Sequence, residues 1–265
     1  MTTPNRIAVA GATGRLGSQL VDVLEERGHT VVMASRTYGV DVITKEGLAE
    51  ALDNVDAIID AATQATPDED AATEFFKTST ANLHEVGHAA GVSRMLTLSI
   101  IGTDRFDSGF IGGVNAHEAA AKAGPIPTDI VRASQFHEFV GQLLDWCTQG
   151  DVAYMPTMRT QPVSARALAE AIADQVDESS DGGRMFEIAG PQEELLPDLA
   201  RLLIEAEGRP VEVEAVVDPL DGERHEQGAL LPGPDARLVG PTYADWAGWT
   251  VDGHPDPPLG PRLVP

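Results

Sequence analysis

Short apolar runs alternate with segments of helical periodicity over the first half of the chain. A helix is predicted over about 14–27, because its leucines and valines recur every three or four residues and Gly28 is a typical stop. Further helices are expected within 44–56 and over 69–91. The runs predicted to be strands are 7–10, 31–34, 57–61, 95–99 and 129–132. Alternating strands and helices with right-handed crossovers indicate an α/β, Rossmann-type fold, a doubly wound parallel sheet with helices on both faces.

The pattern loosens after Pro127, which predicts a smaller carboxyl-terminal lobe. We expect residues 1–155 to form the Rossmann domain and 156–265 the lobe, interleaved with the first and ending in a proline-rich tail, 253–265, that is extended or disordered. Trp246 and Trp249 are expected to pack this lobe. Its predicted helices are 162–178 and 193–208, and its predicted strands are 184–190 and 211–217.

Composition and charge restrict location and partners. The chain has 265 residues, and 42% of them are hydrophobic, which is enough to fill a core. It has neither an apolar run long enough to span a membrane nor a secretory signal, which predicts a cytoplasmic protein. A single cysteine, Cys147, reads as a core thiol, and no spacing suggests zinc. The net charge of −24 disfavours nucleic acid and anionic membranes. We expect a small-molecule substrate and a monomer or homodimer.

The stretch "GATGRLG" follows the first predicted strand and opens the first helix. Gly11 permits a sharp turn, Gly14 lets the backbone approach a pyrophosphate, and Gly17 allows close helix–strand packing. The amino end of the helix adds N–H donors and positive potential. This arrangement predicts a dinucleotide site, although its spacing is G-x-x-G-x-x-G and not the usual G-x-G-x-x-G.

The second predicted strand ends in "MASRTYG", where an NAD-specific protein usually carries an acid. Arg36, next to Ser35, stands there instead, and Arg15 lies within the glycine loop. Two guanidinium groups at these positions favour NADP, because its extra phosphate accepts paired N–H donors. Asp41 and Val42 follow and suit the adenine edge, with a solvated turn as the alternative.

Several segments in order carry a family resemblance. They are "GATGRLG", "AIIDAAT", "LSIIG", "GPIPTDIVRASQFHEFV", "PVSARALAEAIAD" and "FEIAGPQE". Together, over about residues 5–210, the chain resembles the atypical short-chain dehydrogenase/reductases of the NmrA-like, NAD(P)H-binding group. The resemblance implies an NADP-binding Rossmann fold, a carboxyl-terminal part that builds a substrate cleft, and either reductase activity or redox sensing. The residues matched to cofactor contacts are Thr13, Arg15 and Leu16 at the phosphates, Arg36 at the 2′-phosphate, Ala62 and Thr63 beside the nicotinamide ribose, and Gln135 and Phe136 near the nicotinamide.

The chain departs from many short-chain reductases at their Tyr-x-x-x-Lys pair. In those enzymes the lysine lowers the tyrosine pKa and the phenol protonates the alkoxide. Aligned from "GPIP", the two positions are Phe110 and Val114, and none of Lys45, Lys77 and Lys122 follows a tyrosine by four residues. An ordinary ketone reductase is therefore disfavoured.

Three other residues are candidates for catalysis. His117 and His137 are candidates because a free histidine side chain, with a pKa near 6.5, suits proton transfer at neutral pH, and Ser99 resembles a strand-end serine that hydrogen-bonds a substrate oxygen. For each histidine, a structural role is the alternative. His84 and His88 share a helix face, but no third metal ligand is nearby, so a solvated face is expected.

Three functions remain open from sequence. The first is an NADP-dependent oxidoreductase acting on a small organic acceptor such as a quinone, enone, iminium or polyketide-like compound. The second is a non-catalytic NADP(H) sensor that signals through a partner. The third is a Rossmann scaffold that performs a non-redox cyclisation or dehydration.

Overall fold

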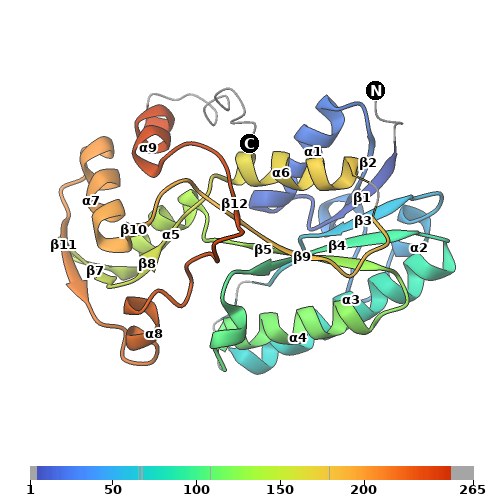
Figure 1. Cartoon of the computed structure of the whole chain (residues 1–265), viewed down its shortest axis with the longest axis horizontal. Helices are drawn as coiled ribbons and strands as arrows, with labels where there is room; N and C mark the ends of the chain where they lie inside the picture. Colours follow the sequence, from blue (N-terminus) through green and yellow to red (C-terminus); the bar gives the residue numbers. More distant parts are fainter. Residues whose placement is uncertain (1–4, 65, 67, 108, 179, 252–265) are drawn as a thin grey trace. The chain divides into compact units, whose positions relative to one another are not determined.

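The computed structural model describes residues 5–64, 66, 68–107, 109–178 and 180–251 (Figure 1). Its main feature is a seven-stranded parallel sheet in the order β12-β9-β5-β4-β3-β1-β2, which confirms the doubly wound Rossmann-type fold. The predicted tail, 253–265, lies outside the described residues. The strands are β1 (Arg6–Ala10), β2 (Thr30–Ala34), β3 (Ala57–Asp60), β4 (Arg94–Ile100), β5 (Thr128–Ala133), β9 (Met185–Ala189) and β12 (Arg237–Leu238).

Helices cover both faces of this sheet (Figure 1). On one face, Arg27, directly after α1, pairs with Asp174 at 2.9 Å and Asp177 at 3.1 Å in α6. On the other face α3 and α4 lie side by side, and Gly113 permits the close approach, because a Cβ there would lie 2.6 Å from Ala72 Cβ. The helices are α1 (Arg15–Glu26), α2 (Leu48–Ala51), α3 (Glu69–Ala89), α4 (Gly109–Ala123) and α6 (Ala165–Asp177), with short 3₁₀ turns η1 (Arg36–Tyr38) and η2 (Thr103–Arg105).

Sequence periodicity locates most of these elements but overestimates one. The predicted apolar face of α1 is buried, and Gly28 follows it with φ +86°. The helix expected within 44–56 shrinks to the four residues of α2. The reason is the backbone around it, because Lys45, Gly47 and Asn54 all adopt positive φ, which interrupts a right-handed helix.

The chain divides into two compact units. Unit 1 comprises Met1–Arg132 and Ala169–Phe186, and unit 2 comprises Ala133–Leu168 and Glu187–Pro265. The sequence placed the division at residue 155 and expected interleaving; in the structure the chain passes from one unit to the other after residues 132, 168 and 186.

Unit 2 packs helices against a small sheet. Its sheets have the orders β11-β7-β6 and β10-β8. Trp246 is 7% exposed and packs the unit as predicted, whereas Trp249 is 38% exposed. The elements are α5 (His137–Cys147), β6 (Thr148–Gln149), β7 (Val152–Pro156), β8 (Arg159–Thr160), β10 (Glu194–Leu195), α7 (Leu196–Glu207), β11 (Glu212–Val216), α8 (Gly222–Glu226) and α9 (Tyr243–Val251).

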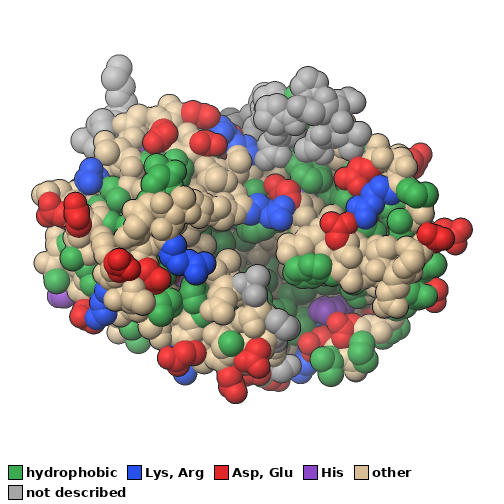
Figure 2. All heavy atoms as spheres, turned by 180° about the vertical axis from the view of Figure 1, so that it is seen from behind, with side chains coloured by type: hydrophobic (Ala, Val, Ile, Leu, Met, Phe, Trp, Pro, Cys, Tyr) green, Lys and Arg blue, Asp and Glu red, His purple; other side chains and the backbone are tan. Residues whose placement is uncertain are grey.

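Acidic side chains are spread over the face of the molecule shown in Figure 2, with fewer basic ones among them. Among the described helices, none is both long and apolar enough to cross a membrane.

Candidate functional site

The three glycines between β1 and α1 meet the steric demands of a phosphate loop. Gly11 has φ +77°, and a Cβ there would lie 2.6 Å from the carbonyl oxygen of Ala61. A Cβ on Gly17 would collide with the carbonyl group of Gly11. The Gly14 amide donates to the Gly11 carbonyl at 2.8 Å, which closes the turn. A side chain at Gly11 or Gly17 would therefore force the loop apart.

The amino end of α1 is open to an anion. Its N-cap residue, Gly14, has no side chain that caps the first-turn amides, and no acid occupies that turn. Thr13 and Arg15 are exposed beside it, whereas Leu16 is buried and anchors the helix. Unpaired N–H groups at a helix start attract phosphate, and Arg15 adds a positive charge.

Directly after β2, Ser35 carries a polar group that no other described residue satisfies. Ser35 Oγ is buried and has no hydrogen-bond partner among the described residues. The next residue, Arg36, is exposed, and no ion pair to Arg36 or Arg15 occurs within the described part of the chain. A buried hydroxyl without a partner costs free energy unless a ligand or water satisfies it.

The loop after Arg36 is held from within the protein. Asp41 Oδ1 accepts from the amides of Ile43 at 2.7 Å and Thr44 at 3.2 Å, so its carboxylate closes a turn. Asn82 of α3 donates to the carbonyls of Val42 at 2.8 Å and Ile43 at 2.9 Å. The turn alternative for Asp41 thus has direct support, and Asn82 is a loop anchor that sequence reasoning missed.

At the end of β3, Asp60 and His117 form a buried pair. His117 Nε2 lies 3.0 Å from Asp60 Oδ2, and the exposed fractions of the two residues are 2% and 0%. The His117 ring also stacks on Phe76, with 4.5 Å between centroids. The structure therefore argues against the expectation that His117 delivers protons to a substrate. Of the segment expected beside the nicotinamide ribose, Ala62 is buried and Thr63 is exposed.

Ser99 belongs to a buried ionic network around Glu118. Its hydroxyl donates to Glu118 Oε1 at 2.6 Å, and Arg132 contacts both carboxylate oxygens, through Nε at 2.8 Å and a terminal nitrogen at 3.1 Å. Lys122 and Asp104 complete the network, at 2.9 Å from Glu118 and 3.1 Å from Arg132. The hydroxyl proton of Ser99 is thus engaged within the protein.

Glu118 carries its negative charge at neutral pH. Burial by itself would raise its pKa, but hydrogen bonds led by Arg132 and followed by Ser99 outweigh this and lower the pKa to about 2. An ionised carboxylate has no proton to donate, so Glu118 cannot act as a general acid. The four-residue spacing of Glu118 and Lys122 is visible in the sequence, but the pairing of Glu118 with Arg132 depends on how α4 packs in the fold.

Part of the chain matches a known protein family. Residues 7–131 match the NAD dependent epimerase/dehydratase family. The chain is 31% identical over 110 residues to Photosystem II assembly factor Ycf39 from Synechocystis, covering 36% of this chain and 34% of that protein. It is 31% identical over 187 residues to 4-hydroxy-tetrahydrodipicolinate reductase from Natronomonas pharaonis, covering 66% of each protein. The chain thus spans less than two thirds of either relative.

Solved structures share the fold at low identity. A nucleoside-diphosphate-sugar epimerase from Staphylococcus aureus gives a TM-score of 0.69 at 14% identity, covering 92% of this chain and 99% of that one. A dTDP-4-dehydrorhamnose reductase from Bacillus anthracis, in complex with NADP, gives 0.67 at 16%, covering 92% and 97%. A short-chain dehydrogenase/reductase superfamily protein from Agrobacterium tumefaciens, with bound NAD, gives 0.61 at 18%, covering 80% and 85%.

The segment that matches the NAD dependent epimerase/dehydratase family, residues 7–131, covers less than half of the chain. In this matched segment, Phe110 and Val114 lie on α4. Val114 is 3% exposed and packs against Ala72 and Phe76 of α3, with Phe110 partly buried beside them. This part of the α4 surface is therefore apolar.

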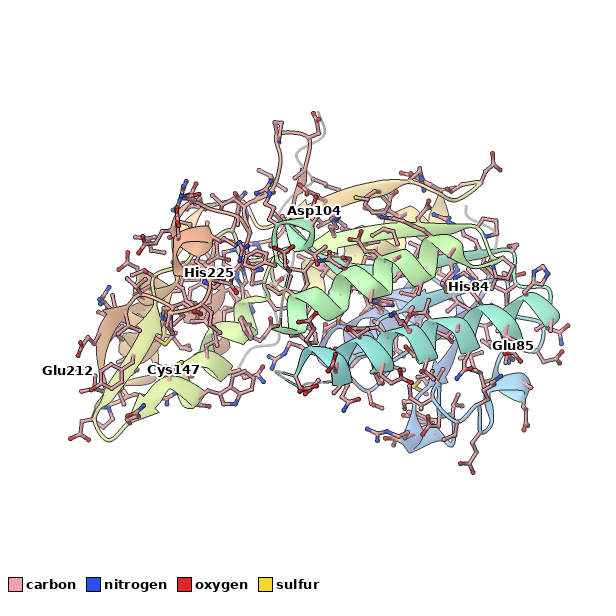
Figure 3. The ribbon with its side chains drawn as sticks, turned by 90° about the horizontal axis from the view of Figure 1, so that it is seen from below. His84, Glu85, Asp104, Cys147, Glu212 and His225 are labelled. Carbon is pink, nitrogen blue, oxygen red and sulfur yellow. The ribbon has the colours of Figure 1, made fainter. Side chains whose placement is uncertain are left out.

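His84 has a structural role in the same segment. It is 3% exposed on α3, its Nε2 lies 3.1 Å from the carbonyl oxygen of Ala121, and its Nδ1 accepts from the Ile126 amide at 3.3 Å (Figure 3). Burial lowers its pKa. The expectation of a solvated His84–His88 face is therefore wrong for His84. No group of three or more possible metal ligands occurs among the described residues.

In unit 2, the residues expected near the nicotinamide are tied into their own unit. Gln135 Oε1 accepts a hydrogen bond from the Thr160 hydroxyl at 2.8 Å, and the backbone of Phe136 forms an isolated parallel β-bridge with that of Val163. His137 is fully buried, with Nε2 3.3 Å from the carbonyl oxygen of Pro241.

Aromatic rings enclose His137. Tyr243 and Trp246 each lie 5.3 Å from it between ring centroids. Burial lowers the pKa of His137 to about 4, so it is neutral at pH 7. The structure thus favours a core role over the predicted proton donor. Proximity in sequence to the end of β5 did not reveal this, because the enclosing residues come about a hundred positions later.

Proposed function

We propose that this protein is an NADP-dependent oxidoreductase that transfers hydride between NADPH and a small organic substrate. The observation that carries the cofactor assignment is Ser35 Oγ, which is buried directly after β2, has no partner among the residues that the structure describes, and lies next to the exposed Arg36. A 2′-phosphate supplies acceptor oxygens for both the hydroxyl and the guanidinium group. An NAD-specific site would carry a carboxylate at this strand end instead.

The remaining cofactor contacts follow from the phosphate loop. Gly11, Gly14 and Gly17 leave room for the diphosphate, and the open first turn of α1 donates N–H groups to it. We assign the 2′-phosphate to Arg15 and Arg36 together, because both side chains are exposed, Arg15 at the start of α1 and Arg36 two residues after β2. Within unit 1, the proposed contacts are completed by Thr13, Leu16, Asp41, Val42, Ala62 and Thr63.

The reduced nicotinamide, when bound, supplies a hydride. The side chains considered as proton donors are committed elsewhere: His117 to Asp60, Ser99 to Glu118, and Glu118 to its cations. With Phe110 and Val114 in place of a Tyr–Lys pair, we propose an acceptor that takes hydride without protonation at the same centre, of the quinone, enone, iminium or polyketide-like class. Two similar proteins are named as reductases, which supports redox chemistry.

Because these side chains already have partners within the protein, a second function is also favoured. It is an NmrA-like sensor that binds NADP(H) without turnover and signals through a partner. Mixing the protein with NADPH and a panel of quinones, enones and imines separates the two. Oxidation of NADPH, followed by its absorbance at 340 nm, supports the enzyme. Tight NADPH binding without turnover, together with a partner that distinguishes the oxidised and reduced forms, supports the sensor. Substrate conversion without any absorbance change indicates a non-redox scaffold.

The cofactor assignment is tested by reversing one charge. Arg36→Glu is expected to weaken NADPH binding by about tenfold or more, since it replaces a charge-assisted donor by a repelling carboxylate, and to leave NADH binding nearly unchanged. Lys77→Glu on the exposed surface of α3 makes the same change of charge and should alter neither affinity. Unchanged NADPH affinity in Arg36→Glu, measured by calorimetry, contradicts the proposal.

A further inference from the structure

Asp60 connects its buried partner, His117, to the backbone beside the phosphate loop. One carboxylate oxygen, Oδ2, faces His117 Nε2 at 3.0 Å. The other, Oδ1, accepts a hydrogen bond from the Ala62 amide at 3.1 Å. Neither oxygen is left to water, because Asp60 has no exposed surface. The orientation of this carboxylate therefore depends on both contacts together.

The backbone that Asp60 holds is one wall of the phosphate loop. A Cβ on Gly11 would lie 2.6 Å from the Ala61 oxygen and 2.9 Å from Ala62 Cα. The Ala61 amide also donates to the carbonyl of Ala10, at 3.1 Å. The loop and the 61–62 segment are thus in direct backbone contact without space between them. A shift of this segment must move Gly11 or open a gap behind it.

His117 is itself fixed from two sides. Its ring stacks on Phe76 with an angle of 14° between the planes, which holds the imidazole against α3. The following residue, Glu118, is pinned by Arg132. The imidazole therefore offers Asp60 a rigid point of attachment, because neither α4 nor the ring is free to turn.

We infer that His117 is a positioning residue: it orients Asp60, Asp60 fixes the Ala61–Ala62 backbone, and this backbone sets the phosphate loop for the dinucleotide. The inference rests on the proposed NADP binding and assigns His117 to cofactor affinity instead of proton transfer. Loss of an outer partner that orients a ligand-holding group typically costs 10–100-fold in affinity in metal sites, so about tenfold is expected here.

The test measures NADP affinity by calorimetry and the midpoint of thermal unfolding in the full-length protein. His117→Phe keeps an aromatic ring against Phe76 but removes the nitrogen facing Asp60, and it should bind NADP about tenfold more weakly. His117→Gln keeps an N–H donor and should stay within about threefold of the wild type. Asp60→Ala should weaken binding at least as much as His117→Phe.

The double variant Asp60→Ala/His117→Phe shows whether His117 acts through Asp60. If it does, the double variant binds NADP as weakly as Asp60→Ala alone. His84→Leu is the matched control, since it removes a buried histidine that links α3 to the end of α4. It should lower the unfolding temperature and leave NADP affinity unchanged.

Two results would overturn the inference. One is His117→Phe with lowered thermal stability but wild-type NADP affinity, which is the behaviour of a merely structural residue. The other is a double variant whose losses add. If His117→Phe does not fold, His117→Gln and His117→Leu provide the same comparison. A wild-type protein that binds no dinucleotide refutes the proposed function itself, which is a different outcome from wild-type binding unaffected by these substitutions.

Discussion

Replacing His137 by Phe should remove a pH-dependent loss of stability from unit 2. Burial lowers the pKa of His137 from 6.5 to about 4 in the folded protein. Between these values the unfolded chain binds a proton at this residue and the folded chain does not. Folding stability therefore falls as pH decreases through this window, and the loss is complete below about pH 4.

The size of the effect follows from the shift. One pKa unit corresponds to about 1.4 kcal/mol, so the full shift amounts to roughly 3 kcal/mol. Between pH 7.5 and pH 5.0 the linkage relation gives about 2 kcal/mol of lost stability for this one group. The carboxylates of the chain also titrate in acid, but they contribute equally to the wild type and to the variant.

Tryptophan fluorescence during urea unfolding is the appropriate assay, because Trp146, Trp246 and Trp249 all belong to unit 2. The wild type should lose about 2 kcal/mol more than His137→Phe between pH 7.5 and pH 5.0. His137→Gln serves if Phe does not fit among Tyr243 and Trp246. Equal pH dependence in wild type and variant would show that His137 is not held neutral by burial, and the argument against it as a proton donor would fail.

Four further substitutions test unit 1. Gly17→Ala should abolish dinucleotide binding and lower the unfolding temperature, because the added Cβ collides with the Gly11 carbonyl group. Gly14→Ala should have smaller effects on both measurements, because its Cβ would lie 3.1 Å from the Gly11 carbonyl oxygen. Arg132→Met should lower the free energy of unfolding by about 3–5 kcal/mol, because the buried Glu118 carboxylate loses its Arg132 partner. Urea unfolding followed by circular dichroism measures this, and a loss below about 1 kcal/mol contradicts the interpretation. Glu118→Gln should reduce the loss of folding stability between about pH 4.5 and pH 2. The lowered pKa of Glu118 stabilises the folded protein at pH values above the ordinary pKa of a glutamate, and this stabilisation is lost as the pH falls through about 2.

Elements with strong local signals were predictable from sequence. β1 and α1 carry their apolar spacing, glycine turn and stop residue within one continuous stretch, so pattern alone located them to within a residue or two. The length of the helix around α2 was overestimated, because Lys45 and Asn54 adopt a left-handed backbone conformation that the sequence does not mark with a glycine at either position.

The side-chain pairs of the site were not predictable, because each joins distant parts of the chain. His117 meets Asp60, the last residue of β3, only once α4 has packed in the fold, and Ser99 of β4 meets Glu118 of α4 in the same way. Sequence reasoning identified residues of suitable chemistry and treated them as free to react. In the fold, that chemistry is used to satisfy neighbouring buried groups.

The way in which the chain passes between its two units has a practical consequence for producing either unit by itself. The segment Ala169–Phe186 belongs to unit 1, although it follows 36 residues of unit 2 (Ala133–Leu168). It supplies both carboxylates that pair with Arg27, and the Arg184 amide that donates to the buried Asp129 at 2.9 Å. A protein cut after residue 155 would expose these groups together, so neither half can be produced faithfully by simple truncation, and a nucleotide-binding fragment would have to be built by joining residue 132 to residue 169 through a linker.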